Sequence, residues 1–218
     1  MASASSRGRL FAPLAHSQAW GSSTIQGVVL SPVLNSLVKG GAFRVGQAIL
    51  LTGKPGSGKT TLIRRVLERL SAPAGGFYTQ EIREGGTRKG FEIITLDGRR
   101  ATMAHVDIRG PHRVGRYGVD VGVVDELAVE AIQAALARHE LVVIDEIGPM
   151  EILSARFRHV VREALESGSP ILGSVVQRST PFTDPIKATP GVRVLEVTRH
   201  NRDVLLPRVL AMLLEFRV

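Results

Sequence analysis

The stretch Gly53-Lys54-Pro55-Gly56-Ser57-Gly58-Lys59-Thr60 decides the fold class of this 218-residue chain. It matches the pattern G-x-x-x-x-G-K-S/T, in which a glycine-rich loop opens a helix. The apolar run Gln47–Thr52 precedes the loop and is typical of a strand, and Lys59–Leu70 follows with its apolar residues on one helical face. A strand, a glycine loop and an amphipathic helix in this order predict a phosphate-binding loop in an α/β fold.

The chemistry of this loop predicts a bound nucleoside triphosphate, ATP or GTP, together with Mg²⁺. Glycines let the backbone wrap around phosphates, and the following helix directs its positive end at the anion. Lys59 would reach the β- and γ-phosphates and take part in catalysis, while the Thr60 hydroxyl would bind the magnesium ion. The residues expected to hold the nucleotide here are Gly53, Lys54, Pro55, Gly56, Ser57, Gly58, Lys59, Thr60 and Thr61.

Two adjacent carboxylates, Asp145 and Glu146, follow the apolar run Leu141–Ile144. Such a run is typical of a parallel strand buried on both faces, and open α/β sheets bind ligands at the carboxyl ends of these strands. We expect Asp145 to hold Mg²⁺ through a water and Glu146 to act as general base for an attacking water. Glu151, a few residues later, either supports this site or simply starts the next helix.

The rest of the chain alternates between strand-like and helix-like segments. Asp125 is expected to cap the helix that precedes Leu141. Further strands are predicted at Phe77–Ile82, Phe91–Leu96, Thr102–Val106, Ile171–Val176 and Val192–Val197, and further helices at Ser154–Ser167 and Asp203–Phe216. This order predicts an α/β three-layer sandwich with a mainly parallel sheet, and the consecutive strands over 76–106 predict an antiparallel extension at one edge.

Residues 1–42 differ from the rest of the chain because they contain no Asp or Glu. We expect them to form a disordered extension, with residues 43–218 as a single domain. The Ser and Arg content resembles a transit peptide, so import into an organelle is the alternative to a cytoplasmic location. A start codon placed too early is a further alternative.

Composition narrows the possible partners and sites. The chain has no cysteine, which excludes disulfides and zinc–thiolate sites, and no apolar run approaches the roughly 18 residues of a membrane span. The net charge of +8 suits a polyanion, but the basic residues do not cluster. A solvated surface is therefore the preferred interpretation, nucleic-acid binding has no support beyond the charge, and we expect a monomer.

Five segments resemble a known family in sequence order. They are GKPGSGKTT at Gly53–Thr61, GFYTQE at Gly76–Glu81 with Gly90-Phe91, RVGRYGV at Arg113–Val119, VIDEIGPME at Val143–Glu151 and VTRHNRDVL at Val197–Leu205. The chain thereby resembles, over roughly residues 46–216, the nucleoside-triphosphatase family that includes the human cancer-related nucleoside-triphosphatase and its thermophilic bacterial and archaeal relatives. The phosphate loop is shared by many families, whereas the GFYT and DEIGxME elements are particular to this one.

The resemblance implies a Mg²⁺-dependent enzyme of the P-loop NTPase fold that slowly hydrolyses nucleoside triphosphates to diphosphate and phosphate. Lys59, Thr60, Asp145 and Glu146 match the family's site positions. Arg113 and Tyr117 match an Arg-x-Gly-x-Tyr element that would approach the nucleotide. Separately, Asn201 and Arg202 match an Asn-Arg pair that would lie near the base. Departures at Ser174 and Gln177-Arg178 leave the contacts to the γ-phosphate open.

Phosphoryl transfer is accelerated by a well-placed arginine, worth roughly 10³–10⁵-fold. Arg113, Arg116, Arg178 and Arg202 are candidates, and the motif favours Arg113 as a catalytic residue. Two alternatives to hydrolysis remain open: a nucleotide or small-molecule kinase, for which residues 83–100 could form a flap, and a nucleotide-dependent RNA-binding switch. The carboxylate pair favours hydrolysis, because a water needs a base.

Overall fold

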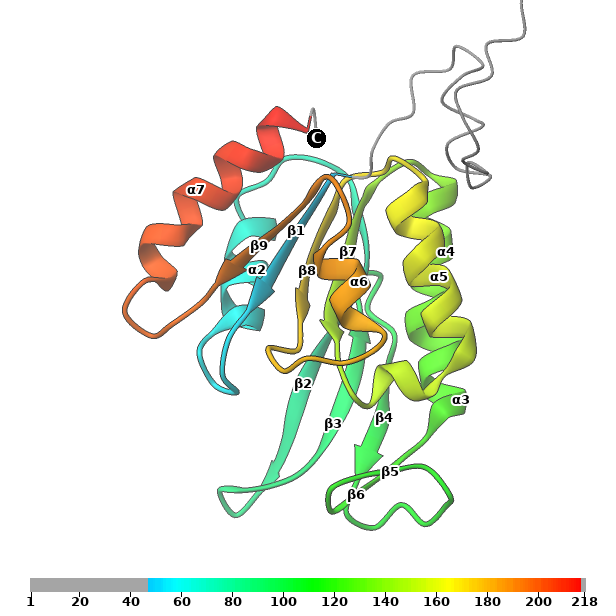
Figure 1. Ribbon diagram of the computed structural model, residues 1–218. Helices are drawn as coiled ribbons and strands as arrows, with labels where there is room; N and C mark the ends of the chain where they lie inside the picture. Colours follow the sequence, from blue (N-terminus) through cyan, green and yellow to red (C-terminus); the bar gives the residue numbers. More distant parts are fainter. Residues whose placement is uncertain (1–46, 217–218) are drawn as a thin grey trace, which may run out of the picture. The chain divides into compact units, whose positions relative to one another are not determined.

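The computed structural model describes residues 47–216, so the extension predicted over residues 1–42 lies outside them. Within the described range nine strands form one sheet in the order β5-β6-β4-β3-β2-β7-β8-β1-β9 (Figure 1). The strands are β1 Ala48–Thr52, β2 Ala74–Glu84, β3 Thr87–Thr95, β4 Arg100–His105, β5 Arg113–Val114, β6 Tyr117–Val119, β7 Leu141–Ile147, β8 Ile171–Val175 and β9 Val192–Glu196. In this spatial order, the neighbouring strands β2-β7-β8-β1-β9 pair in parallel, and the neighbouring strands β5-β6-β4-β3-β2 pair antiparallel.

Helices cover both faces of the parallel strands (Figure 1). Helices α2 and α7 pack on one face, and α4 and α5 on the other. The helices are α2 Lys59–Leu67, α3 Val121–Val123, α4 Glu130–Ala137, α5 Ala155–Glu166, α6 Thr183–Lys187 and α7 Arg202–Glu215, with a π-helical segment at Val124–Val129 and a 3₁₀ turn at Glu151–Leu153. The predicted three-layer α/β fold with an antiparallel edge extension is confirmed.

Strand β1 shows why the central strands are continuously apolar. Its alternate residues enter two separate cores: Ala48 and Leu50 join the core under α4 and α5, and Ile49 and Leu51 join the core under α2 and α7. All four are completely buried. A strand whose two faces both meet helices has no solvent side, so polar alternation is absent.

The antiparallel extension grows out of one long strand. The first half of β2 pairs in parallel with β7 up to Tyr78–Asp145, and its second half runs on past the end of β7 against β3. The β2–β3 turn falls at Gly85-Gly86, where both residues have positive φ. Strands β2, β3 and β4 therefore project beyond the carboxyl end of β7 and can form one wall of a site there.

The prediction that Asp125 caps the following helix is wrong. Helical structure begins at Val121, and Asp120, in an extended conformation, accepts a hydrogen bond from the Val123 backbone N–H. Asp125 lies within the helical stretch, where its carboxylate accepts a hydrogen bond from the Ser154 hydroxyl. The β-branched valines and Gly122 at the start of this stretch are poor helix formers, so its first turn has no local signal besides the Asp120 cap.

Two short features have no counterpart among the predicted elements: the β5–β6 hairpin and helix α6. Both are too short for a periodic apolar pattern. In the part of the chain that the structure describes, no helix combines the length and apolar character needed to cross a bilayer.

Candidate active site

The glycine-rich loop joins the end of β1 to the start of α2. Gly53 has φ 140°, and a Cβ there would lie 2.4 Å from the Val197 carbonyl oxygen. Gly58 has φ 100° and, within the described chain, no side chain caps the helix that begins at Lys59. The first N–H groups of α2 therefore face the loop and are suited to an anion, as a helix N-terminus with its positive dipole end favours.

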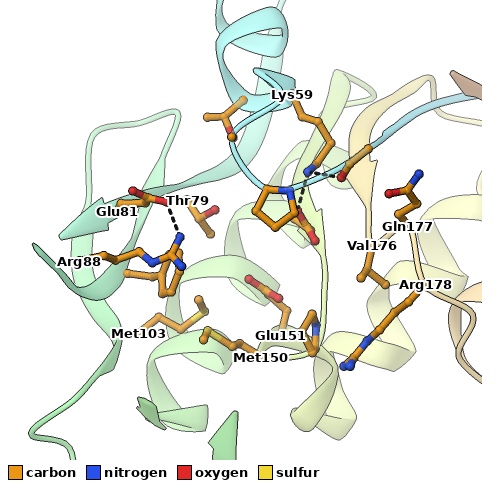
Figure 2. A pocket seen from close by; sticks show the side chains of 17 residues that line it. Lys59, Thr79, Glu81, Arg88, Met103, Met150, Glu151, Val176, Gln177 and Arg178 are labelled. Carbon is orange, nitrogen blue, oxygen red and sulfur yellow. Dashed lines mark hydrogen bonds and ion pairs between the residues drawn. The ribbon is translucent and has the colours of Figure 1, made fainter. Parts of the chain in front are cut away.

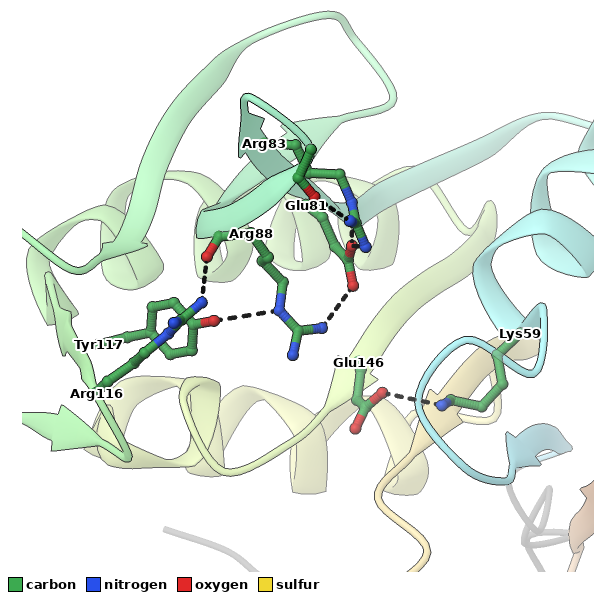
Figure 3. Close-up of polar contacts among 8 residues, drawn as sticks. Lys59, Glu81, Arg83, Arg88, Arg116, Tyr117 and Glu146 are labelled. Carbon is green, nitrogen blue, oxygen red and sulfur yellow. Dashed lines mark hydrogen bonds and ion pairs between the residues drawn. The ribbon is translucent and has the colours of Figure 1, made fainter.

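Lys59 stands between the loop and the end of β7. Its ammonium group donates to the Gly53 carbonyl at 3.2 Å and lies 3.5 Å from Oε2 of Glu146 (Figure 3). Only 10% of the lysine side chain and 26% of the glutamate side chain are exposed. The two residues that the sequence assigned to phosphate binding and to base catalysis are thus direct neighbours.

Asp145 is 1% exposed and lies one strand away from the loop, because β8 separates β7 from β1. The Ser174 hydroxyl of β8 donates to its Oδ1, and Oδ2 has no hydrogen-bond partner among the described residues. Burial raises the pKa of this carboxyl to about 6, against the opposing effect of hydrogen bonds from Ser174 and Thr60. An unpartnered buried carboxylate oxygen beside the Thr60 hydroxyl is a pair of hard oxygen donors, as Mg²⁺ prefers.

No three His, Cys, Asp or Glu side chains within residues 47–216 gather closely enough to hold a metal ion by themselves. Mg²⁺ in nucleotide sites takes one or two protein oxygens and completes its shell with phosphates and water. The donor set of Thr60 and Asp145 therefore fits a nucleotide-bound ion.

Glu151 both opens the 3₁₀ turn and reaches the site. It is 4% exposed, and a Cβ on Gly148 would lie 2.9 Å from its Oε2 and 3.0 Å from Cγ of Glu146. Burial, followed by the negative charge of Glu146, raises the pKa of Glu151 to about 8. Burial therefore favours the protonated, neutral form of this carboxyl group.

A cavity of about 510 Å³ joins these residues to the β2–β3–β4 wall (Figure 2). Glu81 and Arg88 lie on one side of it, Gln177 and Arg178 on the opposite side, and Lys59 above them in the view. The lining residues are Gly53, Pro55, Gly56, Lys59, Thr60, Thr79, Glu81, Arg88, Phe91, Met103, Glu146, Pro149, Met150, Glu151, Val176, Gln177 and Arg178.

Several predicted site residues lie outside this lining. Lys54 and Thr61 are exposed, and Ser57 is buried with its hydroxyl unpartnered among the described residues. Arg113 is exposed and donates to the Arg116 carbonyl, so its catalytic role stays a prediction that its position does not support.

Asn201 and Arg202 lie on the other side of the phosphate loop. The Asn201 amide donates to the Glu196 carbonyl and its Oδ1 accepts from the Thr198 N–H, which fixes the β9–α7 connection. Cδ of Arg202 would be 3.1 Å from a Cβ on Gly58, so this side chain packs against the loop. Their proposed place near the base stays a prediction.

The sequence reasoning missed the charged group on the β2–β3 wall (Figure 3). Arg88 donates to Oε1 of Glu81 at 2.6 Å and to the Tyr117 hydroxyl at 3.2 Å, while Arg83 donates to Oε2 of Glu81 at 2.8 Å. Burial acts to raise the pKa of Glu81, but the hydrogen bonds from Arg88 and Arg83 hold it below its usual value. Residues two positions apart on a strand point to the same face of the sheet. The strand predicted at Phe77–Ile82 therefore indicated that Thr79 and Glu81 share one face.

A glycine-rich loop on a helix N-terminus, a lysine beside it and an acidic strand end one strand away define a P-loop nucleotide-binding protein. The sequence model of the NTPase family matches residues 48–210. The chain is 46% identical over 165 residues to the nucleoside-triphosphatase THEP1 of Thermotoga petrophila, covering 76% of this chain and 92% of the relative. It is 38% identical over 181 residues to the human cancer-related nucleoside-triphosphatase, covering 76% of this chain and 95% of the relative.

Solved structures agree with the sequence match. The crystal structure of THEP1 from the hyperthermophile Aquifex aeolicus aligns with a TM-score of 0.71 and 36% identity over 77% of this chain and 99% of that one. The chain therefore belongs to the NTPase family, as its motifs predicted.

Proposed function

We propose that this protein hydrolyses nucleoside triphosphates to nucleoside diphosphate and phosphate, with Mg²⁺ as cofactor. The observation that carries the proposal is the contact of 3.5 Å between Lys59 of the phosphate loop and Glu146 at the end of β7. It brings a cation for the γ-phosphate and a base for water to one point. The relatives named as nucleoside-triphosphatases support the same reaction.

The protein's own residues have separate tasks in this reaction. The N–H groups at the start of α2 hold the phosphates, and Lys59 moves its contact from Glu146 to the phosphate oxygens. The freed Glu146 carboxylate then takes a proton from the water that attacks the γ-phosphorus. Thr60 and Asp145 would hold the Mg²⁺ ion, which, when bound, neutralises charge on the phosphates.

Two substitutions test the division of roles, with phosphate release from ATP and GTP as the assay. Lys59→Ala should lose binding of a fluorescent ATP analogue, because the loop loses its cation. Glu146→Gln keeps the side-chain shape, so it should retain binding and lower kcat by roughly 10²–10⁴-fold, the usual contribution of a general base. Chelation of Mg²⁺ by EDTA should stop turnover, and added Mg²⁺ should restore it.

Glu163→Gln is a matched control, since Glu163 is an exposed residue of α5, a helix on the sheet face opposite to α2. Its turnover should equal that of the unmodified protein. Normal turnover by Glu146→Gln would show that another group activates the water. Tight binding without any turnover in the unmodified protein would reject hydrolysis altogether.

A further inference from the structure

The cavity extends well beyond the phosphate loop. A hydrolase needs space for one water between Glu146 and the γ-phosphate, yet the cavity continues past Glu146 to the β2–β3–β4 wall. In Figure 3, Glu146 lies between Lys59 and the group formed by Glu81 and Arg88. The part of the cavity beyond Glu146 therefore lies on the other side of Glu146 from Lys59 of the phosphate loop.

The lining of this outer part combines apolar side chains with a few polar groups. Phe91, Met103 and Met150 supply the apolar surface, and the Arg88 guanidinium lies 5.3 Å from the centre of the Phe91 ring. A small-molecule site is built in this way, with apolar and aromatic walls and a few placed polar groups that orient the ligand. Methionine side chains adapt their shape to planar ligands.

Glu81 and Arg88 form the polar end of this outer part. Each side chain is about one third exposed, 34% for Glu81 and 36% for Arg88, although both take part in an ion pair. Nε of Arg88 donates to the Tyr117 hydroxyl and Nη1 donates to the Glu81 carboxylate, whereas Nη2 makes no hydrogen bond among the described residues. The pair thus presents a carboxylate acceptor next to a free N–H donor, in an orientation fixed by neighbours.

The charge of the outer part favours an uncharged ligand. Glu81 is shared by Arg88 and the exposed Arg83, and the Glu146 carboxylate lies between this group and Lys59 of the phosphate loop (Figure 3). The two arginines, Glu81 and Glu146 together carry no net charge, and a phosphorylated ligand would lie beside the Glu146 carboxylate, whose partner Lys59 is needed by the triphosphate. A neutral ring with a donor and an acceptor on its edge matches the Glu81–Arg88 pair without this penalty.

We propose that the outer part of the cavity is an acceptor site for a nucleoside-sized neutral alcohol with a planar ring, which the protein phosphorylates from the bound triphosphate. The ring lies against Phe91, Met103 and Met150, with its polar edge on Glu81 and Arg88. This arrangement directs the hydroxyl toward Glu146 and the γ-phosphate. The proposal rests on the triphosphate site of the proposed function, and adds a second substrate to it.

The reaction balances with the groups already described. The hydroxyl oxygen of the acceptor forms a bond to the γ-phosphorus, and the bond between that phosphorus and the β,γ-bridging oxygen breaks. The hydroxyl proton passes to Glu146, and the nucleoside diphosphate leaves with the bridging oxygen. Hydrolysis is the same displacement with water in the place of the alcohol, so it occurs when the acceptor site holds no alcohol.

The direct test is phosphoryl transfer from γ-³²P-labelled ATP with Mg²⁺ to adenosine, guanosine, cytidine or uridine. We expect label on the primary hydroxyl of at least one nucleoside, one ADP for each labelled product, and slower phosphate release as the nucleoside concentration rises. 5′-Deoxyadenosine, which keeps the ring and lacks that hydroxyl, should slow phosphate release without becoming labelled. Glycerol, which has hydroxyls and no ring, should do neither.

Two arginines that each pair with a glutamate on the antiparallel strands provide matched variants. Arg88→Gln removes the guanidinium from the cavity and should lower the ratio of transfer to hydrolysis by roughly tenfold to a hundredfold, mainly through the acceptor KM. Arg100→Gln removes the partner of Glu92, and Arg100 is exposed and outside the cavity lining. The ratio of transfer to hydrolysis of this variant should stay unchanged. A thermal melt of both variants checks that the wall remains folded.

The outcomes separate this proposal from the proposed hydrolysis. Phosphate release with no labelled nucleoside, at concentrations up to the solubility limit, overturns the acceptor site and leaves the hydrolase intact. Nucleoside binding without transfer also overturns it, because the site is then regulatory. Absence of both phosphate release and transfer rejects the triphosphatase proposal itself. If Arg88→Gln folds and transfers normally, the assigned recognition by the wall is wrong.

Discussion

The pKa of Glu151 allows a quantitative test of how burial affects a carboxyl group in this site. The residue is 4% exposed, and burial raises its pKa from the ordinary glutamate value of 4.5 to about 8. Between these values the folded protein keeps a proton that the unfolded chain releases. Native Glu151 therefore lowers stability progressively as pH rises through this window, and below 4.5 it has no such effect.

The size of this effect follows from the two pKa values. The interval from 4.5 to about 8 corresponds to an upper limit of roughly 5 kcal/mol above pH 8, and about 3 kcal/mol at pH 7. Glu151→Gln keeps the shape of the protonated side chain and cannot ionise. We expect the variant to match the unmodified protein near pH 4.5 and to exceed its stability increasingly toward pH 8.

Urea denaturation of the nucleotide-free protein, followed by circular dichroism across this pH range, measures the difference. Glu163→Gln is the control, because Glu163 is an exposed residue of α5 and its replacement should change the stability only slightly. A gain in stability for Glu151→Gln that is equal at both ends of the range would refute the reasoning. It would mean that Glu151 titrates like an exposed glutamate.

Two further predictions concern the fold around the site. Gly76→Ala should destabilise the protein by about 3 kcal/mol or more, because Gly76 has φ 115° and the new Cβ would lie 2.1 Å from the Val143 carbonyl oxygen. Gly86→Ala, with φ 78° and open space around it, should cost clearly less in the same urea titration. Asp120→Ala should lower stability by about 1 kcal/mol through loss of the cap on Val123, and an unchanged thermal midpoint would contradict this.

The phosphate loop and the acidic strand end could be predicted because their signals are local. The loop needs glycines at fixed spacing, and β7 needs an apolar run followed by carboxylates, so both patterns lie within a few neighbouring residues. Their contact is not local. The pairing of Lys59 with Glu146 depends on the order of strands, with β8 between β1 and β7, and the sequence does not state that order.

The Glu81–Arg88 pair shows a second limit. From the Gly85-Gly86 turn, regular pairing continues only through Arg83 and Arg88, and a register shift follows between Ile82 and Arg83. The shift sets Glu81 opposite Phe91. A shift of one position exchanges the faces of a strand, so turn position alone could not assign these side chains to the cavity.

Charge balance links the parts of this site. A triphosphate is a dense anion, yet Asp145, Glu146 and Glu151 all lie at the end of β7 or just after it. The negative charge of each carboxyl group is reduced in a different way. Glu146 forms an ion pair with Lys59, and burial favours the protonated form of Glu151. Asp145 accepts a hydrogen bond from Ser174, and its Oδ2, which has no partner among the described residues, is suited to a cation. In the proposed reaction Lys59 turns to the phosphates and Glu146 loses its partner. Glu146 is therefore the carboxylate that we propose as the proton acceptor in phosphoryl transfer.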